Sequence, residues 1–282
     1  MTFWDDKVVV VTGGSAGLGL VLSQSFAAAG CQVVIASRGE EQGEQAVDTI
    51  GSEKACFIAT DVTDTDSVTH LVEQTIEDHG KIDVWVNNAG RSSRGLAQET
   101  SIKEYEELLE LNFLALVRCS QAAIPHLLAS QGHLVNIGSL SAKTASPYMG
   151  GYAASKYPVA AYSQQLRLEN KARDLHVLLV APGPIRRQDN QPRYQAQSRE
   201  LPASAGTPGG GVKLKGICPR RLSAKILLAC KRRRPELVVP TYARFLFALA
   251  QISPRLGDWI VKKMTRKHPR LGLSCPKRWA FA

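Results

Sequence analysis

Three side chains near the middle of the chain have the types and spacing for redox chemistry: Ser139, Tyr152 and Lys156. Positions i and i+4 of a helix share a face, so the Tyr152 hydroxyl and the Lys156 ammonium can reach one pocket. A phenol titrates near ~10, and a nearby ammonium lowers that pKa toward the neutral range, which would make Tyr152 a usable acid. With the Ser139 hydroxyl, the pair indicates interconversion of a carbonyl and an alcohol. A tyrosine and a lysine at this spacing are otherwise typical of a solvated helix face.

A glycine-rich turn near the N-terminus indicates nucleotide binding. The apolar run Lys7–Thr12 leads into the turn, and an amphipathic segment follows from about Leu18 to Gly30. Glycines let the backbone approach a pyrophosphate, and the helix N-terminus offers free N–H groups. The spacing differs from G-x-G-x-x-G, so the turn alone also fits a loop that only needs positive φ angles. The candidate cofactor contacts in the turn are Gly13, Ser15, Gly17, Leu18 and Gly19.

The choice of cofactor depends on the end of the second predicted strand. A carboxylate there binds the ribose hydroxyls of NAD, whereas a basic residue suits the extra phosphate of NADP. The chain has Ser37 and Arg38 at this place. Arg38 can give charge-assisted hydrogen bonds to a 2′-phosphate. We therefore expect NADP(H), with a surface arginine at a strand exit as the alternative.

Taken together, these residues resemble the short-chain dehydrogenase/reductase (SDR) family over residues 5–185. The resemblance rests on motifs in the family's order and approximate spacing. They are Thr12-Gly13-x-x-x-Gly17-x-Gly19, Asp61-Val62, Asn87-Asn88-Ala89-Gly90, Asn112, Ser139, Tyr152-x-x-x-Lys156 and Pro182-Gly183-Pro184-Ile185.

The resemblance implies a role for each matched position. NADPH would deliver hydride to a substrate carbonyl while Tyr152 protonates the developing alkoxide, assisted by Ser139, for which Ser141 is a rival. Lys156 would hold the nicotinamide ribose and lower the Tyr152 pKa, and Asn112 would anchor a water that relays the proton. Without the tyrosine–lysine pair, Asn112 would fit a structural amide and Ser139 a strand cap. Further implied cofactor contacts are Asp61, Val62, Asn88, Ala89, Gly90, Tyr152, Lys156, Pro182, Gly183 and Ile185, while Asn87 fits a structural cap equally well.

Two positions depart from the family pattern. Many members have Thr at the fifth position after the proline of the Pro-Gly motif, where it clamps the nicotinamide carboxamide, but this chain has Arg187. Pro158 falls inside the helix expected to carry Lys156. It removes a hydrogen bond to the Ala154 carbonyl and can bend the helix axis.

Strand and helix patterns alternate along the chain, which predicts an α/β fold with a doubly wound parallel sheet (Rossmann fold) and helices on both faces. We expect one catalytic domain over residues 1–240 and an extension over 241–282. Six cysteines without paired spacing indicate neither a metal site nor a disulfide framework, and the absence of an apolar leader favours a cytoplasmic location. The predicted strands are Val8–Val11, Val33–Ala36, Cys56–Ala59, Val84–Val86, Leu134–Ile137, Val177–Ala181 and, as a seventh, Glu236–Pro240.

The basic charge of the chain belongs to its C-terminal third. Residues 1–185 carry 13 Lys and Arg against 21 Asp and Glu, whereas residues 186–282 carry 22 against 4. Residues 186–216 contain few large apolar side chains and predict a mobile loop. The resemblance makes this loop the substrate lid, and a solvated insertion is the alternative. A helix is expected to begin near Pro219 and to end at the basic cluster 231–234.

Two apolar stripes, Tyr242–Ile252 and Leu256–Ile260, lie beside Lys262 and Lys263. Neither reaches the ~20 apolar residues that span a bilayer. Aromatic and leucine side chains flanked by cations favour peripheral contact of residues 242–282 with an anionic membrane. A wall of the substrate pocket and a dimer interface are the alternatives. No basic–aromatic nucleic-acid motif is present, so nucleic acid is not an expected partner, and a homo-oligomer (dimer or tetramer) is expected.

The sequence therefore predicts an NADPH-dependent oxidoreductase acting on a small-molecule carbonyl or secondary alcohol. The C-terminal extension resembles those of relatives that act on membrane-soluble substrates, and this resemblance implies a lipophilic substrate such as a keto-lipid or a steroid-like ketone. One alternative is a 3-oxoacyl-carrier-protein reductase, because an acidic carrier would suit the basic C-terminal third. Another is a binding protein that senses NADP without catalysis.

Overall fold

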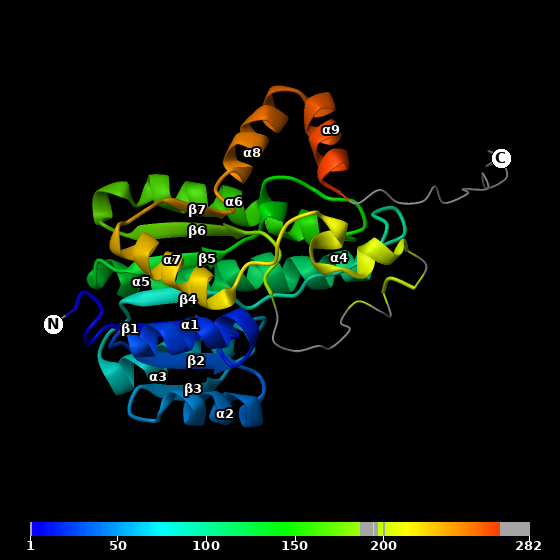
Figure 1. Cartoon of the computed structure of the whole chain (residues 1–282). Coiled ribbons are helices and arrows are strands. Elements are labelled where there is room, and N and C mark those ends of the chain that lie inside the picture. The colour runs from blue at the N-terminus through cyan, green and yellow to red at the C-terminus, as the bar shows by residue number, and fades with distance from the viewer. Residues whose placement is uncertain (1, 187–193, 195–196, 200, 266–282) are drawn as a thin grey trace, which may run out of the picture.

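A computed structural model describes residues 2–186, 194, 197–199 and 201–265. Seven parallel strands form one sheet in the order β3-β2-β1-β4-β5-β6-β7 (Figure 1). The chain starts at the centre of the sheet, builds one half outward and then crosses to β4. The crevice beyond the carboxyl ends of β1 and β4 is therefore the expected ligand site. The strands are β1 (Val8–Thr12), β2 (Gln32–Ser37), β3 (Ala55–Ala59), β4 (Val84–Asn87), β5 (His133–Ile137), β6 (His176–Pro182) and β7 (Glu236–Val239).

Helices cover both faces of this sheet (Figure 1). Side chains alternate along each strand, so Val9 and Val11 pack with α1 and α7, whereas Val10 packs on the other face with α3, α5 and α6. Both faces are apolar, which explains the nearly continuous hydrophobic runs in the strands. The helices are α1 (Gly17–Ala28), α2 (Glu40–Ile50), α3 (Thr65–His79), α4 (Ile102–Leu109), α5 (Ala115–Ala129), α6 (Tyr152–Glu169), α7 (Pro219–Lys231), α8 (Ala243–Ile252) and α9 (Pro254–Met264).

The fold class is as predicted, and each of the seven predicted strands is confirmed to within one residue at either end. The helical segment after β4 is not one regular helix. A π-helical turn, η1 (Glu110–Leu114), divides it into α4 and α5. Such turns insert a residue into a helix and often occur at functional sites. Asn112 lies in this turn and is buried.

Helices α8 and α9 form a hairpin that projects beyond β7 (orange and red in Figure 1). The predicted break between them is confirmed, because Ser253 caps α9 and Pro254 begins it. Within the part of the chain that the structure describes, no helix has the length and apolarity to cross a membrane.

The segment predicted as a loop contains two short turns among its described residues, η4 (Ala203–Gly206) and η5 (Pro208–Gly211). Lys213 donates its backbone N–H to the carbonyl of Met264 at 2.7 Å. Val212 and Thr265 form an isolated antiparallel bridge. The end of this segment is therefore attached to the end of α9.

Candidate active site

The glycine turn between β1 and α1 leaves space for a ligand. Gly13 and Gly17 have φ angles of +62° and +55°, where a residue with a Cβ would be strained. A Cβ on Gly19 would lie 2.0 Å from the Gly13 carbonyl oxygen, so only glycine fits there. A Cβ on Gly17 would meet no atom within 4 Å. The turn is thus closed on its protein side and open where α1 begins, which suits a bound pyrophosphate.

The loop after β4 is attached to this turn. The Thr12 hydroxyl oxygen accepts hydrogen bonds from the backbone N–H groups of Asn88 and Ala89, at 3.0 and 3.1 Å. The Asn88 amide nitrogen donates to the Thr12 carbonyl at 3.0 Å. Asn87 points into the protein and donates to Ser120 Oγ and Asn136 Oδ1, both at 2.9 Å. Asn87 is therefore structural, as one interpretation of the sequence had it.

The end of β2 contains an unsatisfied polar atom. Ser37 Oγ is buried and has no hydrogen-bond partner in the described part of the chain. The exposed Arg38 is close enough to Asp61 to contribute to lowering the pKa of that carboxyl, although hydrogen bonds from Thr63 are the main cause. Asp61 Oδ1 accepts from the Thr63 backbone and hydroxyl at 2.9 and 2.7 Å. Asp61 thereby shapes the turn after β3, in which Val62 is buried.

Asn112 connects three parts of the site. Its Oδ1 accepts from the backbone N–H of Arg91 at 2.9 Å, and its Nδ2 donates to the Arg91 carbonyl at 2.9 Å. The same Nδ2 donates to Ser155 Oγ on α6 at 2.8 Å. The Asn112 amide therefore fixes the loop after β4 against the helix that carries Tyr152 and Lys156.

Ser139 lies at the carboxyl end of β5 and contacts the tyrosine. Its hydroxyl accepts the backbone N–H of Ser141 at 3.0 Å and forms a hydrogen bond with the Tyr152 phenol. The first of these bonds caps a short 3-10 turn, η2 (Leu140–Ala142). Of the two rival serines, Ser139 is the one bonded to Tyr152.

The pKa of Tyr152 differs from the value expected from its spacing to Lys156. Burial raises the Tyr152 pKa, while the Ser139 hydrogen bond and, more weakly, the charge of Arg94 lower it. Lys156 is buried, and burial lowers its own pKa to about 8. Its Nζ donates to the Ile137 carbonyl at 3.0 Å. In the protein alone Lys156 is not among the groups that lower the Tyr152 pKa, which differs from the expectation, and burial outweighs the groups that do lower it.

These groups surround a cavity of about 700 Å³. The cavity runs from the glycine turn, past Tyr152, to the α8–α9 hairpin. Predicted site residues that line it are Gly13, Gly17, Leu18, Asn88, Ala89, Gly90, Ser139, Tyr152, Lys156, Pro182, Gly183 and Ile185. Those that do not line it are Ser15, Gly19, Ser37, Arg38, Asp61, Val62 and Asn112, of which Gly19 and Asn112 are buried behind it. Arg187 lies outside the described residues.

Comparison with known proteins decides the family. The profile of the family described as short chain dehydrogenase matches residues 7–198. This chain belongs to that family. The protein is thus an oxidoreductase acting on CH–OH groups, and its family uses NAD(P)(H). It is 31% identical over 275 residues to a dehydrogenase/reductase SDR family protein 7-like from Anopheles gambiae, a match that covers 93% of this chain and 84% of the relative.

Solved structures share the fold of this short-chain dehydrogenase. A short chain dehydrogenase/reductase from Burkholderia phymatum in complex with NAD has a TM-score of 0.77 at 22% identity, covering 91% of this chain and 96% of that one. The L-sorbose reductase of Gluconobacter frateurii, complexed with NADPH and L-sorbose, has a TM-score of 0.72 at 23% identity, covering 83% and 95%. One neighbour holds NAD and the other NADPH, so the shared fold does not decide between them.

One group in this dehydrogenase's cavity was not found from the sequence, and a second was predicted only as one of several alternatives. Arg94 lines it and is only 4% exposed, although an arginine in a polar loop gives no sign of burial. The inner side of the hairpin also lines it, through Leu246, Phe247, Ile260 and Met264. An amphipathic pattern predicts that a helix has an apolar face but does not say what covers that face.

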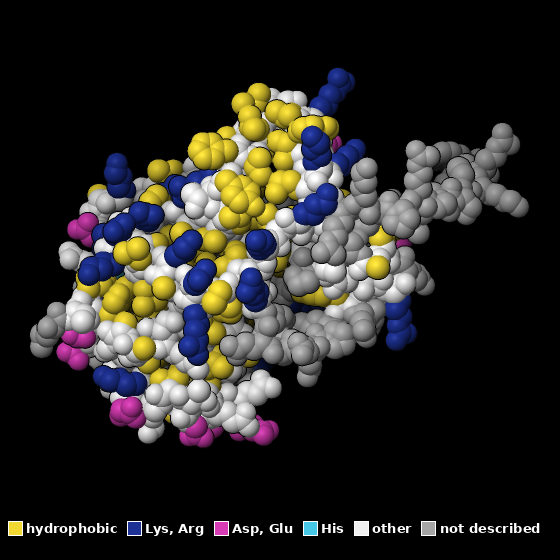
Figure 2. All heavy atoms as spheres, viewed as in Figure 1, with side chains coloured by type: hydrophobic (Ala, Val, Ile, Leu, Met, Phe, Trp, Pro, Cys, Tyr) yellow, Lys and Arg dark blue, Asp and Glu magenta, His cyan; other side chains and the backbone are white. Residues whose placement is uncertain are grey.

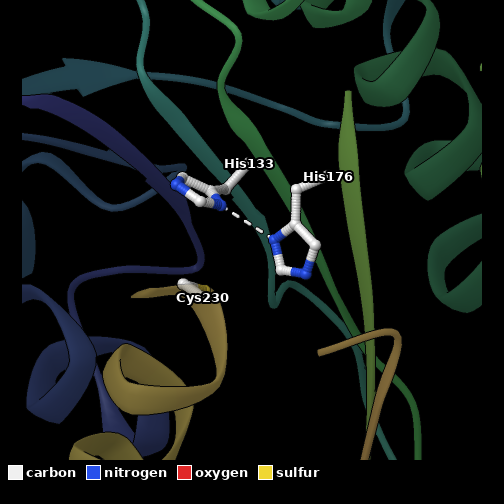
Figure 3. A group of neighbouring side chains, drawn as sticks. All are labelled: His133, His176 and Cys230. Atoms are coloured by element: carbon white, nitrogen blue, oxygen red, sulfur yellow. Dashed lines mark hydrogen bonds between the residues drawn. The ribbon is translucent and has the colours of Figure 1, made fainter. Parts of the chain in front are cut away.

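A second cluster of titratable side chains lies at the opposite, amino end of the strands (Figure 3). His133, His176 and Cys230 are buried, and their potential ligand atoms lie within 4.8 Å of one another. The two Nδ1 atoms are 2.8 Å apart, and His176 Nε2 is 2.8 Å from the Arg234 carbonyl oxygen. A carbonyl only accepts, so His176 Nε2 carries a proton and neutral His176 accepts from His133 Nδ1–H. This hydrogen-bonded chain satisfies both Nδ1 atoms without an ion, although the cysteine spacing gave no sign that the three residues would meet.

Proposed function

We propose that this protein is an NADPH-dependent oxidoreductase that interconverts a lipophilic ketone and the corresponding secondary alcohol. The observation that carries the proposal is the hydrogen bond between Ser139 and Tyr152 in a cavity that Lys156 also lines. A positioned phenol that can transfer its proton to a nearby oxygen is the group this reaction requires.

Three residues of the chain would handle the proton. In the reductive direction the Tyr152 hydroxyl donates its proton to the substrate oxygen, and that oxygen is held by Ser139. Lys156, whose pKa is lowered to about 8 by burial, can exchange a proton near neutral pH. Asn112 holds the loop after β4 against α6 and so helps to fix the position of the helix that carries Tyr152 and Lys156. The anchoring of a relay water by Asn112 stays a prediction.

The residues present fit the cofactor. The open N-terminus of α1, with Gly13 and Gly17, would hold the pyrophosphate, and Lys156 the nicotinamide ribose. The unsatisfied Ser37 Oγ and the exposed Arg38 would hold the 2′-phosphate, which favours NADPH over NADH. When bound, NADPH supplies the hydride.

A lipophilic substrate is supported by the wall that the hairpin contributes to the cavity. Leu246, Phe247, Ile260 and Met264 are apolar, and they lie at the end of the cavity remote from the glycine turn. Apolar surface there would bind a hydrocarbon skeleton while the polar group of the substrate reaches Tyr152. The assignment of residues 186–216 as a substrate lid stays a prediction, and residues 187–193, 195–196 and 200 of this segment lie outside the described residues. The assignment of residues 241–282 as an extension of a catalytic domain also stays a prediction, and residues 266–282 lie outside the described residues.

The outer side of the hairpin favours peripheral contact with an anionic membrane. Its exposed apolar side chains lie among Lys and Arg (Figure 2), and Lys263 Nζ stacks 4.3 Å from the centre of the Trp259 ring. Cations and an aromatic side chain together suit the headgroup region of a bilayer. A cytoplasmic location and a dimeric or tetrameric state stay predictions. The exposed apolar side chains are Tyr242, Phe245, Leu249, Ile252 and Trp259.

A substrate screen tests this function. Purified protein is incubated with NADPH or NADH and matched pairs of ketones that differ in apolar bulk, with 3-oxoacyl thioesters as a separate set. We expect turnover of the bulkier ketones with NADPH. Turnover of thioesters alone would favour a carrier-protein reductase, and cofactor binding without any turnover would favour an NADP sensor.

A further inference from the structure

Arg94, on the loop after β4, is a buried cation held by backbone oxygens. Its Nε donates to the Ala205 carbonyl at 2.8 Å and its Nη2 to the Thr207 carbonyl at 3.2 Å. Its Nη1 donates to Ser92 Oγ at 2.9 Å and to the Ser93 carbonyl at 2.6 Å. The guanidinium carbon lies 3.7 Å from the centre of the Tyr194 ring. Most of the guanidinium's donors are therefore used, and its orientation is fixed.

In the part of the chain that the structure describes, this cation has no acidic partner. Within the described ranges, no carboxylate forms a salt bridge or hydrogen bond with Arg94. Carbonyl dipoles and an aromatic face stabilise the guanidinium but leave its net charge in place. A buried charge is screened less by solvent than a charge on the surface, so its field reaches neighbouring groups in the cavity.

The backbone brings this charge next to Tyr152. Gly95, the residue after Arg94, pairs with Met149, and the Gly150 N–H donates to the Gly95 carbonyl at 3.0 Å. Tyr152 follows as the first residue of α6. Arg94 and Tyr152 line the same cavity. This backbone pairing therefore attaches the loop that carries Arg94 to the segment that leads into Tyr152.

We propose that Arg94 is a positioning residue that stabilises the ionised form of Tyr152 during proton transfer. The inference rests on the proposed function. In the reductive step the Tyr152 O–H bond breaks and a substrate O–H bond forms, so the phenol becomes a phenolate and the alkoxide becomes a neutral alcohol. The positive charge of the guanidinium stabilises that phenolate by electrostatic attraction. The same guanidinium donates to the carbonyls of Ala205 and Thr207, so the position of its charge depends on this part of the loop after β6.

The other groups that face Tyr152 do not replace this charge. Ser139 is neutral, and Lys156, although mostly protonated at neutral pH with a pKa of about 8, is not among the groups that shift the Tyr152 pKa. Tyr194, whose own charge when ionised would be negative, raises the Tyr152 pKa. Arg94 lowers the Tyr152 pKa and, although burial lowers its own, remains protonated because guanidinium pKa values are so high.

Direct titration of Tyr152 tests the proposal without turnover. Ultraviolet difference titration of tyrosinate, with Tyr152→Phe as the reference, reports the Tyr152 pKa in each variant. We expect Arg94→Gln to raise this pKa by about 1 unit, as loss of an adjacent charge does. Arg94→Lys keeps the charge and should stay closer to the wild type. Arg94→Met, which leaves no unpaired polar atom of its own, replaces Arg94→Gln if the latter does not fold.

Alcohol oxidation gives a second measurement, because it requires ionised Tyr152. In Arg94→Gln the rise of kcat/KM with pH should move to higher pH by the same amount. The matched control is Arg91→Gln on the same loop, which removes the exposed partner of Glu107 and should leave the Tyr152 titration in place. An unchanged Tyr152 pKa in Arg94→Gln, or an equal shift in Arg94→Lys, would overturn the proposal. Activity retained by Tyr152→Phe would instead overturn the proposed function.

Discussion

Asn112 and Ser155 are joined by a buried hydrogen bond of 2.8 Å from the side-chain amide to the hydroxyl. Ser155 in turn donates to the Tyr152 carbonyl at 2.8 Å. The π-helical turn η1 is thus connected to the first turn of α6. The other bonds of the amide, to the backbone of Arg91, extend the connection to the loop after β4.

Replacing Asn112 with Ala should therefore weaken both the fold and the reaction. The part-buried backbone N–H and C=O groups of Arg91 lose their partners, which should lower the free energy of unfolding by about 1 to 3 kcal/mol. Denaturant unfolding measures this loss, and kcat/KM should fall at least tenfold. Ser155→Ala is the comparison variant. It removes one of the three bonds of the amide, together with the bond from Ser155 to the Tyr152 carbonyl, but keeps both bonds to Arg91, so it should lower kcat/KM less than Asn112→Ala does. Equal stability of Asn112→Ala and the wild type would contradict the positioning role.

The His133–His176 pair should make the protein sensitive to acid. Burial lowers the pKa of His133 to about 3 and that of His176 to about 4, and the repulsion between the two adds to the effect at His133. Both values lie below the ordinary 6.5, so the unfolded state binds protons first. The stabilisation is complete above about pH 6.5 and is lost as the pH falls toward about 4.

Thermal unfolding at several pH values checks this expectation. The double variant His133→Gln/His176→Gln should be less stable than the wild type at neutral pH but should lose less stability between about pH 7 and about pH 4. Parallel curves for the two proteins would show that other groups cause the acid sensitivity.

Arg38 should determine the cofactor. Loss of a charge-assisted hydrogen bond to a phosphate costs about 1.5 to 3 kcal/mol, so Arg38→Ala should raise the KM for NADPH roughly tenfold to a hundredfold. The KM for NADH, which lacks the phosphate, should change little. Steady-state kinetics with both cofactors measure the ratio. Equal effects on the two would mean that the exposed arginine has no part in cofactor choice.

The outer side of the hairpin should bind anionic vesicles. Phe245 and Trp259 are 74% and 53% exposed. The double variant Phe245→Ser/Trp259→Ser should weaken co-sedimentation with phosphatidylserine vesicles about a hundredfold or more, because each substitution loses about 1.5 to 3 kcal/mol of apolar burial in the membrane. Ile102→Ser is the control, since Ile102 is also exposed but lies on α4. Unchanged vesicle binding by the double variant would show that the outer side of the hairpin does not bind the membrane.

The strands and the nucleotide-binding turn were predictable because local patterns encode them. A run such as Val8–Val11, buried on both faces, is apolar throughout, and Gly13 and Gly17 mark the positive φ angles of the turn. The π-helical turn at Asn112 was not predictable, since no residue type specifies it. The hairpin was predicted as two apolar stripes, yet only the packing revealed that its inner side lines the cavity.

Electrostatic properties were the least predictable part of the site. The spacing of Tyr152 and Lys156 correctly predicts that they share a pocket. It does not predict their burial, which raises the pKa of Tyr152 and lowers that of Lys156. Arg94 looks like a surface residue in the sequence. Its burial depends on carbonyls more than a hundred residues away along the chain.

The central claim, that Tyr152 transfers the proton, is tested most directly by the turnover of Tyr152→Phe with NADPH and the best ketone from the screen. The variant keeps the ring and loses only the hydroxyl, so NADPH binding, followed by fluorescence, should be unchanged. We predict that kcat falls by about 10²- to 10⁴-fold, the contribution typical of general acid catalysis. A kcat within a few-fold of the wild type, with NADPH still bound, would contradict the account.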